Sequence, residues 1–381
     1  MNIIVLGAGR VGTAIARDLS ADDAFDVRVA DRDGERLALL ENRWGIRGER
    51  VDFSLPSTVG RAIADADLVI SAVPGFLGHR TLEAIIDAKK NVVDIAFFGE
   101  DPFSLDDLAK AEGVTAIVDC GVAPGLSNLL VGHAVRRLNE AARVEIYVGG
   151  LPADPVPPYE YRAVFSPIDV IEEYTRPARI VVDGDVVTRP ALSEVEQIEF
   201  GEIGTLEAFN TDGLRTLMKT VDCPQMIEKT LRYPGHADKV RLLRDTGFFS
   251  AEPVEIEGRE IRPLDLTTAL LFPLWQLKEG EEDVTVLRVI VEGKRDSERL
   301  SYRYDLIDRF DRRTETTSMA RTTGYMAAMG ARALAAGMVD VRGVLAPEML
   351  TTDPSCVDFI LGGLRERGID VRETTTPLDA R

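Results

Sequence analysis

Residues 2–12 read NIIVLGAGRVG, and this stretch decides the fold of the N-terminal part of the chain. An apolar run leads directly into a glycine-rich turn, and an amphipathic segment follows from Val11. Such a run is typical of a strand that is buried on both faces in a parallel sheet. The spacing of Gly7, Gly9 and Gly12 predicts a tight turn that opens a helix. We therefore expect a strand, a turn and a helix in that order.

The first 120 residues repeat this alternation of short apolar runs and amphipathic segments. The predicted strands are Asn2–Leu6, Val27–Ala30, Arg50–Asp52, Leu68–Ser71, Val92–Ile95 and Thr115–Asp119. The predicted helices are Val11–Leu19, Gly34–Arg43, Ser57–Ala64, Thr81–Ala88 and Leu105–Glu112. Strands and helices that alternate with short connections indicate an α/β fold with a doubly wound parallel sheet, the Rossmann arrangement.

The pattern changes after Gly125. A helix is predicted at Ser127–Leu138 and a strand at Val144–Val148, and the segment LPADPVPPYEY (151–161) holds too many prolines for a regular element. Two hairpins follow. They are IVVDGDVVTR (180–189) and the pair VTVLRVIVEG (284–293) and RLSYRYDLIDRF (299–310).

At 381 residues the chain exceeds the usual size of a single hydrophobic core, so we expect two domains. Residues 1–124 form the Rossmann domain. Residues 125–315 form an α+β domain with a mostly antiparallel sheet. Residues 316–381, with the predicted helices Met319–Ala336 and Pro354–Arg367, are expected to return and pack on the first domain.

The charge of the chain restricts its partners. Its 45 basic and 64 acidic residues give a net charge of −19, which argues against binding to nucleic acid or to an anionic membrane. A solvated acidic surface explains this charge. Adaptation to a salty cytoplasm is the alternative.

Composition also indicates the cellular compartment of the protein. No run approaches the roughly 18 apolar residues of a membrane helix, and the apolar N-terminus lacks the basic region of a signal peptide. The cysteines at 120, 223 and 356 have no paired spacing, so we expect neither a metal site nor disulfides. A cytoplasmic location fits this pattern.

The glycine turn predicts a site for a nicotinamide dinucleotide. Gly7 permits the tight turn, Gly9 lets a pyrophosphate approach the backbone, and Gly12 allows close helix–strand packing. The predicted helix Val11–Leu19 presents its N-terminus to the phosphates, and Arg10 and Val11 are expected cofactor contacts there.

Asp31 identifies the expected dinucleotide. It lies nineteen residues beyond Gly12 at the end of the second strand, where a ribose 2′-hydroxyl needs an acceptor. NAD is therefore favoured over NADP, although Arg32 is able to stack on adenine or to pair with a 2′-phosphate. Further expected contacts follow the third and fourth strands. These residues are Asp52, Ala72, Val73 and Pro74.

Three polar residues mark the expected reaction side. His79 follows the segment SAVPGFLG, Asp94 lies in the apolar segment VVDIAFF, and Asp119 ends the sixth predicted strand. A carboxylate in an apolar strand is costly unless it is paired or hydrogen-bonded, which favours a functional role for Asp94. His79 is alternatively an ordinary residue at the start of a helix, and Asp119 alternatively caps a turn.

Several long downstream segments carry a family resemblance. They are GVAPGLSNLLVGHAV (121–135), VGGLP (148–152), PPYEYRAVFSP (157–167), EYTRPA (173–178), LEAFNTDGLRTL (206–217) and TLRYPGHADK (230–239). Together they resemble the lysine 6-dehydrogenase and saccharopine dehydrogenase family, and the similarity extends to GVLAPE (343–348). The resemblance implies a substrate domain with a dimer-forming sheet, a homodimer, and oxidation or formation of an amine on a lysine-type amino acid.

Two motifs separate the members of the family. Saccharopine reductases resemble this chain at VGGLP, at TLRY and at His79, but they carry Asp-Pro-Gly where this chain has Ala123-Pro124-Gly125 and Ser-Tyr where it has Ala96-Phe97. The GVAPG and LEAFNTDG segments look more like lysine 6-dehydrogenases. We therefore expect NAD-dependent oxidation of the ε-carbon of L-lysine to the semialdehyde with release of ammonia. A saccharopine dehydrogenase is the alternative, and a non-catalytic NAD(P)-binding sensor is the second alternative.

This chemistry requires a base, because an ε-ammonium must lose a proton before hydride leaves. His79 and Asp94 are the candidates, with Asp119 in reserve. Phe97 would cover the alkyl chain of the substrate or is an ordinary core aromatic.

The resemblance assigns the remaining substrate contacts to the second domain. Arg232 would bind the α-carboxylate, because its planar fork suits a carboxylate and the family motif places it in the pocket. Tyr233 and His236 lie on the same motif. Asp212 would pair with the α-ammonium, or it caps a loop.

Overall fold

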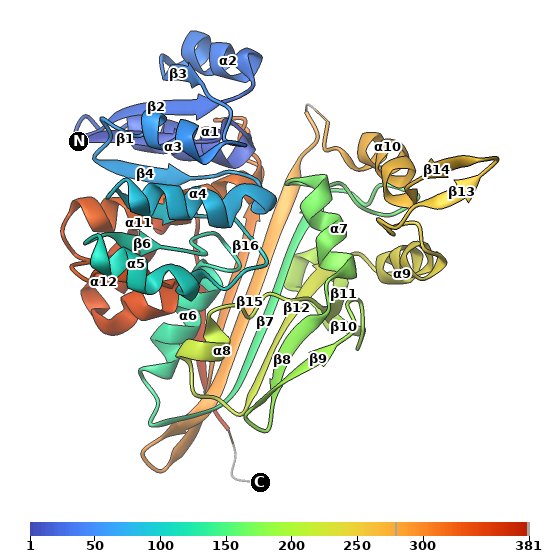
Figure 1. Cartoon of the computed structure of the whole chain (residues 1–381). Coiled ribbons are helices and arrows are strands. Elements are labelled where there is room, and N and C mark those ends of the chain that lie inside the picture. Colours follow the sequence, from blue (N-terminus) through green and yellow to red (C-terminus); the bar gives the residue numbers. More distant parts are fainter. Residues whose placement is uncertain (279, 379–381) are drawn as a thin grey trace. The chain divides into compact units, whose positions relative to one another are not determined.

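The computed structural model describes residues 1–278 and 280–378, which form two compact units (Figure 1). The first unit comprises residues 1–136 and 319–371, and the second comprises residues 137–318 and 372–378. The first boundary lies twelve residues after the expected position at 124, because helix α6 (Leu126–Val135) packs on a 3₁₀ helix, η3 (Pro347–Thr352), of the first unit.

The C-terminal part of the chain, which was expected to return to the first domain, is divided between the two units. Helices α11 (Ser318–Ala335) and α12 (Pro354–Glu366) precede strand β18 (Arg372–Pro377). This strand pairs antiparallel with β16 (Glu298–Arg309), so residues 372–378 belong to the second unit. A sheet edge presents unpaired backbone groups to which a passing strand adds, and a local sequence pattern does not reveal that pairing.

The sheet of the first unit is parallel throughout. Among the described residues it has seven strands in the order β17-β6-β5-β4-β1-β2-β3. Their bounds are β1 (Asn2–Leu6), β2 (Asp26–Asp31), β3 (Arg47–Arg50), β4 (Leu68–Ser71), β5 (Asn91–Asp94), β6 (Thr115–Ile117) and β17 (Gly343–Leu345). The strand order reverses at β1 and β4, and ligands of doubly wound folds bind beyond the carboxyl ends of strands at such a point.

Helices cover both faces of this sheet (Figure 1). Their remaining bounds are α1 (Arg10–Ser20), α2 (Gly34–Trp44), α3 (Pro56–Ala62), α4 (Gly75–Asp87), η1 (Pro102–Leu105) and α5 (Asp106–Ala111). Apolar residues of α3, α4 and α5 form a core with one face of the strands, while α1 packs near Gly324 of α11. The predicted Rossmann fold is therefore confirmed.

Two elements differ from their predicted positions. Helix α4 begins at Gly75 instead of Thr81, because Gly78 lies where any side chain would meet the ring of Phe98 at 2.5 Å, and this packing stabilises a helical segment of low propensity. Strand β3 covers Arg47–Arg50 instead of 50–52. All four of its residues are exposed at the sheet edge, so no apolar run marks it.

The second unit is built on a mixed, mostly antiparallel sheet, as predicted. Within the described part of the chain this sheet has nine strands, and the pairing of β7 with β12 is parallel. The bounds are β7 (Glu140–Pro152), β8 (Ala178–Val182), β9 (Asp185–Arg189), β10 (Glu196–Glu199), β11 (Thr205–Asn210), β12 (Gln225–Arg232), β15 (Asp283–Arg295), β16 and β18. Both predicted hairpins are present, as β8–β9 and β15–β16.

The other elements of the second unit surround a separate core. They are α7 (Pro167–Thr175), η2 (Gly201–Ile203), α8 (Leu217–Thr220), α9 (His236–Thr246), the hairpin β13 (Val254–Ile256) with β14 (Arg259–Ile261), and α10 (Pro263–Trp275). Helices α7, α9 and α10 bury a cluster that includes Tyr161, Tyr174 and Trp275. None of the helices that the structure describes is long and apolar enough to span a membrane.

Candidate cofactor and active site

The glycine turn joins β1 to α1 at the carboxyl edge of the parallel sheet. Gly7 has φ +115°, and a Cβ on it would lie 2.5 Å from the carbonyl oxygen of Ala72 after β4. A Cβ on Gly12 would lie 2.0 Å from the carbonyl oxygen of Gly7. Only glycine fits at these two positions, because both neighbours are backbone atoms.

Gly9 differs from the other two glycines. A Cβ on Gly9 would meet no described atom within 4 Å, so the space above it is open. Gly9 is also the N-cap of α1, and no side chain among the described residues caps this helix. A helix N-terminus beside open space is a site for an anion, and the pyrophosphate of a dinucleotide fits it. Arg10, which is exposed, and Val11, which is half-buried, begin the helix.

Asp31 ends β2 next to this turn. Its Oδ2 accepts the backbone N–H of Ala8 at 2.6 Å, and its Oδ1 accepts the N–H of Asp33 at 2.8 Å. Asp33 in turn caps α2 through the N–H groups of Glu35 and Arg36. The carboxylate of Asp31 is therefore held at the turn, and each oxygen keeps a lone pair for a ribose hydroxyl.

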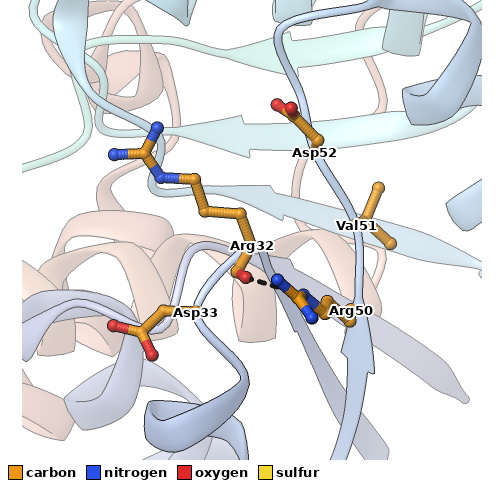
Figure 2. Close-up of a pocket in the computed structure, with 5 residues that line it drawn as sticks. All are labelled: Arg32, Asp33, Arg50, Val51 and Asp52. Atoms are coloured by element: carbon orange, nitrogen blue, oxygen red, sulfur yellow. Dashed lines mark hydrogen bonds between the residues drawn. The ribbon is translucent and has the colours of Figure 1, made fainter.

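A pocket of about 440 Å³ lies between the residues that follow β2 and those at the end of β3 (Figure 2). It is lined by Arg32, Asp33, Arg50, Val51 and Asp52. Arg50 folds back so that its Nε donates to the carbonyl oxygen of Arg32 at 3.1 Å, while the side chain of Arg32 extends away from that bond. Hydrogen bonds from Ser54 and, to a smaller extent, the charge of Arg32 lower the pKa of Asp52.

The residues after β4 complete this edge. Ala72 donates its N–H to the carbonyl oxygen of Leu6 in β1 at 2.9 Å, and the contact of Ala72 with Gly7 brings the two strand ends together. Val73 is buried, and Pro74 is the exposed N-cap of α4. The structure therefore brings the expected cofactor residues of β1, β2 and β4 to one edge.

His79 lies in the second turn of α4 and not at its start, because the helix begins at Gly75. The side chain is half-buried. Its Nε2 lies 3.1 Å from the hydroxyl oxygen of Ser104, and its ring packs edge-on against Phe98 with centroids 5.7 Å apart. His79 is thus the most accessible of the three expected catalytic residues.

Both carboxylates of the expected catalytic set are buried. Asp94 ends β5 with 0% exposure, and its Oδ1 accepts the N–H of Ala96 at 3.0 Å. Asp119 is 2% exposed and has φ +50° just before the turn at Gly121. Phe97 follows β5 and is half-buried.

In the second unit, Arg232 does not present its guanidinium as a carboxylate clamp. It is 2% exposed, its Nη2 bonds Glu173 at 2.9 Å, and its Nε donates to the hydroxyl of Tyr174 at 3.2 Å. Its guanidinium also lies 4.7 Å from the ring centre of Tyr161. The chain thus supplies a carboxylate to Arg232 from α7, through Glu173.

The other expected substrate residues are also held by the protein. Tyr233 donates to the carbonyl oxygen of Pro152 at 3.0 Å. Asp212 binds the Nε and Nη2 of Arg179 at 2.9 and 2.8 Å, which makes it a structural partner and not a free acceptor for an ammonium. Tyr233 and Asp212 therefore both have partners within the second unit.

His236 is buried at the start of α9. Its Nδ1 lies 2.8 Å from the carbonyl oxygen of Tyr159, and its Nε2 lies 2.8 Å from the hydroxyl of Tyr174. Burial and the neighbouring charge of Arg232 lower the pKa of His236 to about 3. Both ring nitrogens of His236 therefore have partners within the core of the second unit.

Three residues near the expected site were missed. Arg50 was expected at the start of the third strand, whereas it ends β3, so its approach to Arg32 was not expected. Asp33 and Ser104 each lie in a helix-capping sequence. Asp33 directly precedes a predicted helix, and the segment Asp-Pro-Phe-Ser that ends at Ser104 is a typical start of a helical turn. Such cap signals identify backbone partners, but they do not identify neighbours far away in the chain.

The parallel sheet, the glycine turn and the fixed carboxylate after β2 define a dinucleotide-binding Rossmann domain. Two family models match the chain. The saccharopine dehydrogenase NADP binding domain matches residues 3–117, and the saccharopine dehydrogenase C-terminal domain matches residues 121–369. The chain therefore belongs to the saccharopine dehydrogenase family, which confirms the resemblance found in the sequence.

Individual relatives match at low identity. The mitochondrial alpha-aminoadipic semialdehyde synthase of Bos taurus is 25% identical over 249 residues, which cover 62% of this chain and 27% of that protein. The NADP(+), L-glutamate-forming saccharopine dehydrogenase of Saccharomyces cerevisiae is 26% identical over 275 residues, which cover 68% of this chain and 61% of that protein. The chain thus spans less than two thirds of the length of both relatives.

Two comparisons extend over the whole chain. The carboxyaminopropylagmatine dehydrogenase of Synechocystis is 23% identical, with 97% of both chains covered. The solved structure of the L-Glu-forming saccharopine dehydrogenase from Saccharomyces cerevisiae has a TM-score of 0.81 and 21% identity, with 98% of this chain and 99% of that chain covered. The second comparison shows that the fold is shared.

Proposed function

We propose that the protein is a nicotinamide-dinucleotide-dependent dehydrogenase that acts on a carbon bonded to an amine nitrogen. The observation that carries this proposal is the turn at Gly7, Gly9 and Gly12 beside the fixed carboxylate of Asp31. The family membership supports the class of the reacting bond.

The cofactor would be held by the edge of β1, β2 and β4. The first turn of α1 faces the open space at Gly9, where the pyrophosphate fits. We propose NAD over NADP, because Asp31 accepts a ribose 2′-hydroxyl and repels a 2′-phosphate. The positive charges of Arg32 and Arg50 would instead favour the 2′-phosphate of NADP. The matching family model is also described as NADP-binding. We give more weight to Asp31, since Arg50 already donates to a backbone carbonyl.

The reaction begins with the substrate's amine in its neutral form. An alkyl ammonium has a pKa of about 10.4, so a base must take a proton from it near neutral pH. His79 is the proposed base because its half-buried ring is accessible, whereas Asp94 and Asp119 are buried. When bound, the dinucleotide accepts the hydride. Phe97 beside this edge would exclude water from the alkyl chain.

Two substrates are candidates. The motifs GVAPG and LEAFNTDG favour the ε-amine of lysine, with Ala96, Phe97 and Ala123 in place of the polar residues of saccharopine reductases. The names of the relatives favour a saccharopine-type secondary amine. No substrate role is proposed for Arg232, because Glu173 already neutralises it.

The experiment follows absorbance at 340 nm with NAD or NADP and either lysine or saccharopine. Turnover with lysine and NAD supports the first candidate, and turnover with saccharopine alone supports the second. Tight binding of a dinucleotide without oxidation of any amine would refute the proposed dehydrogenase and favour a non-catalytic sensor.

A further inference from the structure

Ser104 holds His79 from outside the helix that carries it. Ser104 lies in η1, and its hydroxyl oxygen is 3.1 Å from Nε2 of His79. The same hydroxyl donates to the carbonyl oxygen of Asp101 at 2.7 Å. A carbonyl oxygen only accepts and a serine hydroxyl has one proton, so when Ser104 bonds Asp101 its oxygen is left as an acceptor for His79.

This arrangement decides which nitrogen of His79 carries a proton. Since the hydroxyl proton of Ser104 points to Asp101, the contact with His79 is a hydrogen bond that Nε2–H donates to Oγ. In the neutral imidazole one nitrogen donates and the other accepts. This orientation of the Ser104 hydroxyl favours the Nε2–H tautomer of the neutral His79 ring, with its lone pair on Nδ1.

The surroundings fix the ring as well as its proton. The turn that carries Ser104 is itself fixed, because Asp101 Oδ1 accepts the N–H of Phe103 at 3.2 Å. Phe98 is 2% exposed and meets the ring of His79 edge-on at 81°. Phe98 lies there because Gly78 has no side chain to displace it.

We propose that Ser104 is a positioning residue that holds His79 in the Nε2–H tautomer, so that Nδ1 is the atom that takes the proton from the substrate's amine. In this step the ammonium N–H bond breaks, a bond forms between that proton and Nδ1, and the electron pair stays on the amine nitrogen. Nε2–H continues to donate to Ser104, and the same oxygen stabilises the imidazolium. The catalytic half of this inference rests on the proposed function, whereas the tautomer does not.

His236 provides an internal reference for the test. Its Nδ1 faces the carbonyl oxygen of Tyr159 and must donate, so its neutral form is the Nδ1–H tautomer, opposite to that of His79. The chain has three histidines, and the third is His133. His133→Gln and His79→Gln variants assign the three signals.

The test is long-range ¹H–¹⁵N correlation spectroscopy of the full chain labelled on histidine, at a pH where imidazoles are neutral. We expect His79 as Nε2–H and His236 as Nδ1–H in the wild type. In Ser104→Ala, His79 becomes a mixture of both tautomers, and Ser104→Thr restores the wild-type spectrum. The matched control is Ser20→Ala, which removes the same kind of bond to a carbonyl three residues earlier, that of Arg17, and leaves His79 unchanged.

Kinetics test the catalytic half on whichever amine the enzyme oxidises. Ser104→Ala should lower kcat by about threefold to tenfold with little change in KM, the range expected for one lost neutral hydrogen bond, and Ser104→Thr should restore it. An Nδ1–H signal for His79, or an unaltered spectrum in Ser104→Ala, overturns the inference. A changed tautomer with wild-type kcat overturns its catalytic half. If no amine is oxidised by the wild type, the proposed function fails while the spectra still decide the role of Ser104.

Discussion

Replacement of Asp31 by asparagine should change the dinucleotide preference. Asparagine keeps the size of the side chain and one acceptor oxygen, but it removes the charge beside the pocket of Arg32 and Arg50. The loss of a charge-assisted hydrogen bond to the ribose hydroxyl weakens the binding of NAD by about 1 kcal/mol, since such bonds are roughly twice as strong as neutral ones.

The effect on NADP has the opposite sign. At a separation of about 5 Å, one pair of unit charges repels by roughly 1 kcal/mol in water and by about 3 kcal/mol at an effective dielectric constant of 20. The pocket is open to solvent, so the lower half of this range applies. The ratio of NAD to NADP affinity should therefore fall by about 2–3 kcal/mol, roughly 30- to 150-fold.

The assay is calorimetric titration of NADH and NADPH, which needs no knowledge of the substrate. Asp26→Asn is the matched control, because Asp26 begins the same strand, is exposed and pairs with Arg47 away from the turn. Melting curves report the structural cost, because Asp31 also accepts the N–H groups of Ala8 and Asp33. An affinity ratio that stays within twofold of the wild type in a folded Asp31→Asn variant would refute the assignment.

Four further changes test the two units. Gly9→Ala should keep the melting temperature of the wild type, because its Cβ meets no described atom within 4 Å. It should weaken the binding of NADH roughly tenfold in the same titration, and wild-type affinity would contradict the proposed pyrophosphate site. Gly12→Ala should lower the melting temperature by several degrees, because its Cβ would lie 2.0 Å from a backbone oxygen; an unchanged melting curve would exclude that contact. Arg232→Ala should cost about 3–5 kcal/mol in urea unfolding by leaving Glu173 without its partner, and adding Glu173→Gln should recover part of this loss. Burial raises the pKa of Glu228 to about 8, so its contribution to stability is present below its ordinary pKa and is lost as the pH rises toward 8. The melting temperature of Glu228→Gln relative to the wild type should therefore be higher at pH 8 than at pH 5. A difference between the two proteins that does not depend on pH would contradict the raised pKa.

The cofactor edge was predicted largely from the sequence because its determinants are local. Gly7, Gly9 and Gly12 act through backbone geometry within six residues, and Asp31 is fixed by the end of the next strand. Strand β3 was misplaced because an exposed edge strand carries no apolar pattern.

The partners of the expected substrate residues could not be predicted from the sequence, because burial and pairing are not local properties. Arg232 is a residue type that binds carboxylates. Glu173, which lies 59 residues earlier in the chain, already bonds its guanidinium. Asp212 is matched in the same way by Arg179, 33 residues away. A motif gives the residue types, and the fold decides whether a partner inside the chain already satisfies them.

The sequence by itself determined the strand, turn and helix at residues 2–20, the parallel sheet that follows from their repetition, and the family of the chain. Short-range backbone geometry and hydrophobic periodicity are written into consecutive residues, so they are legible without coordinates. The tertiary structure alone decided that Arg232 is internally paired, that β18 joins the second sheet, and that Ser104 meets His79 across 25 residues. Each of these depends on which distant groups come within bonding distance, and only the packing of the folded chain determines that.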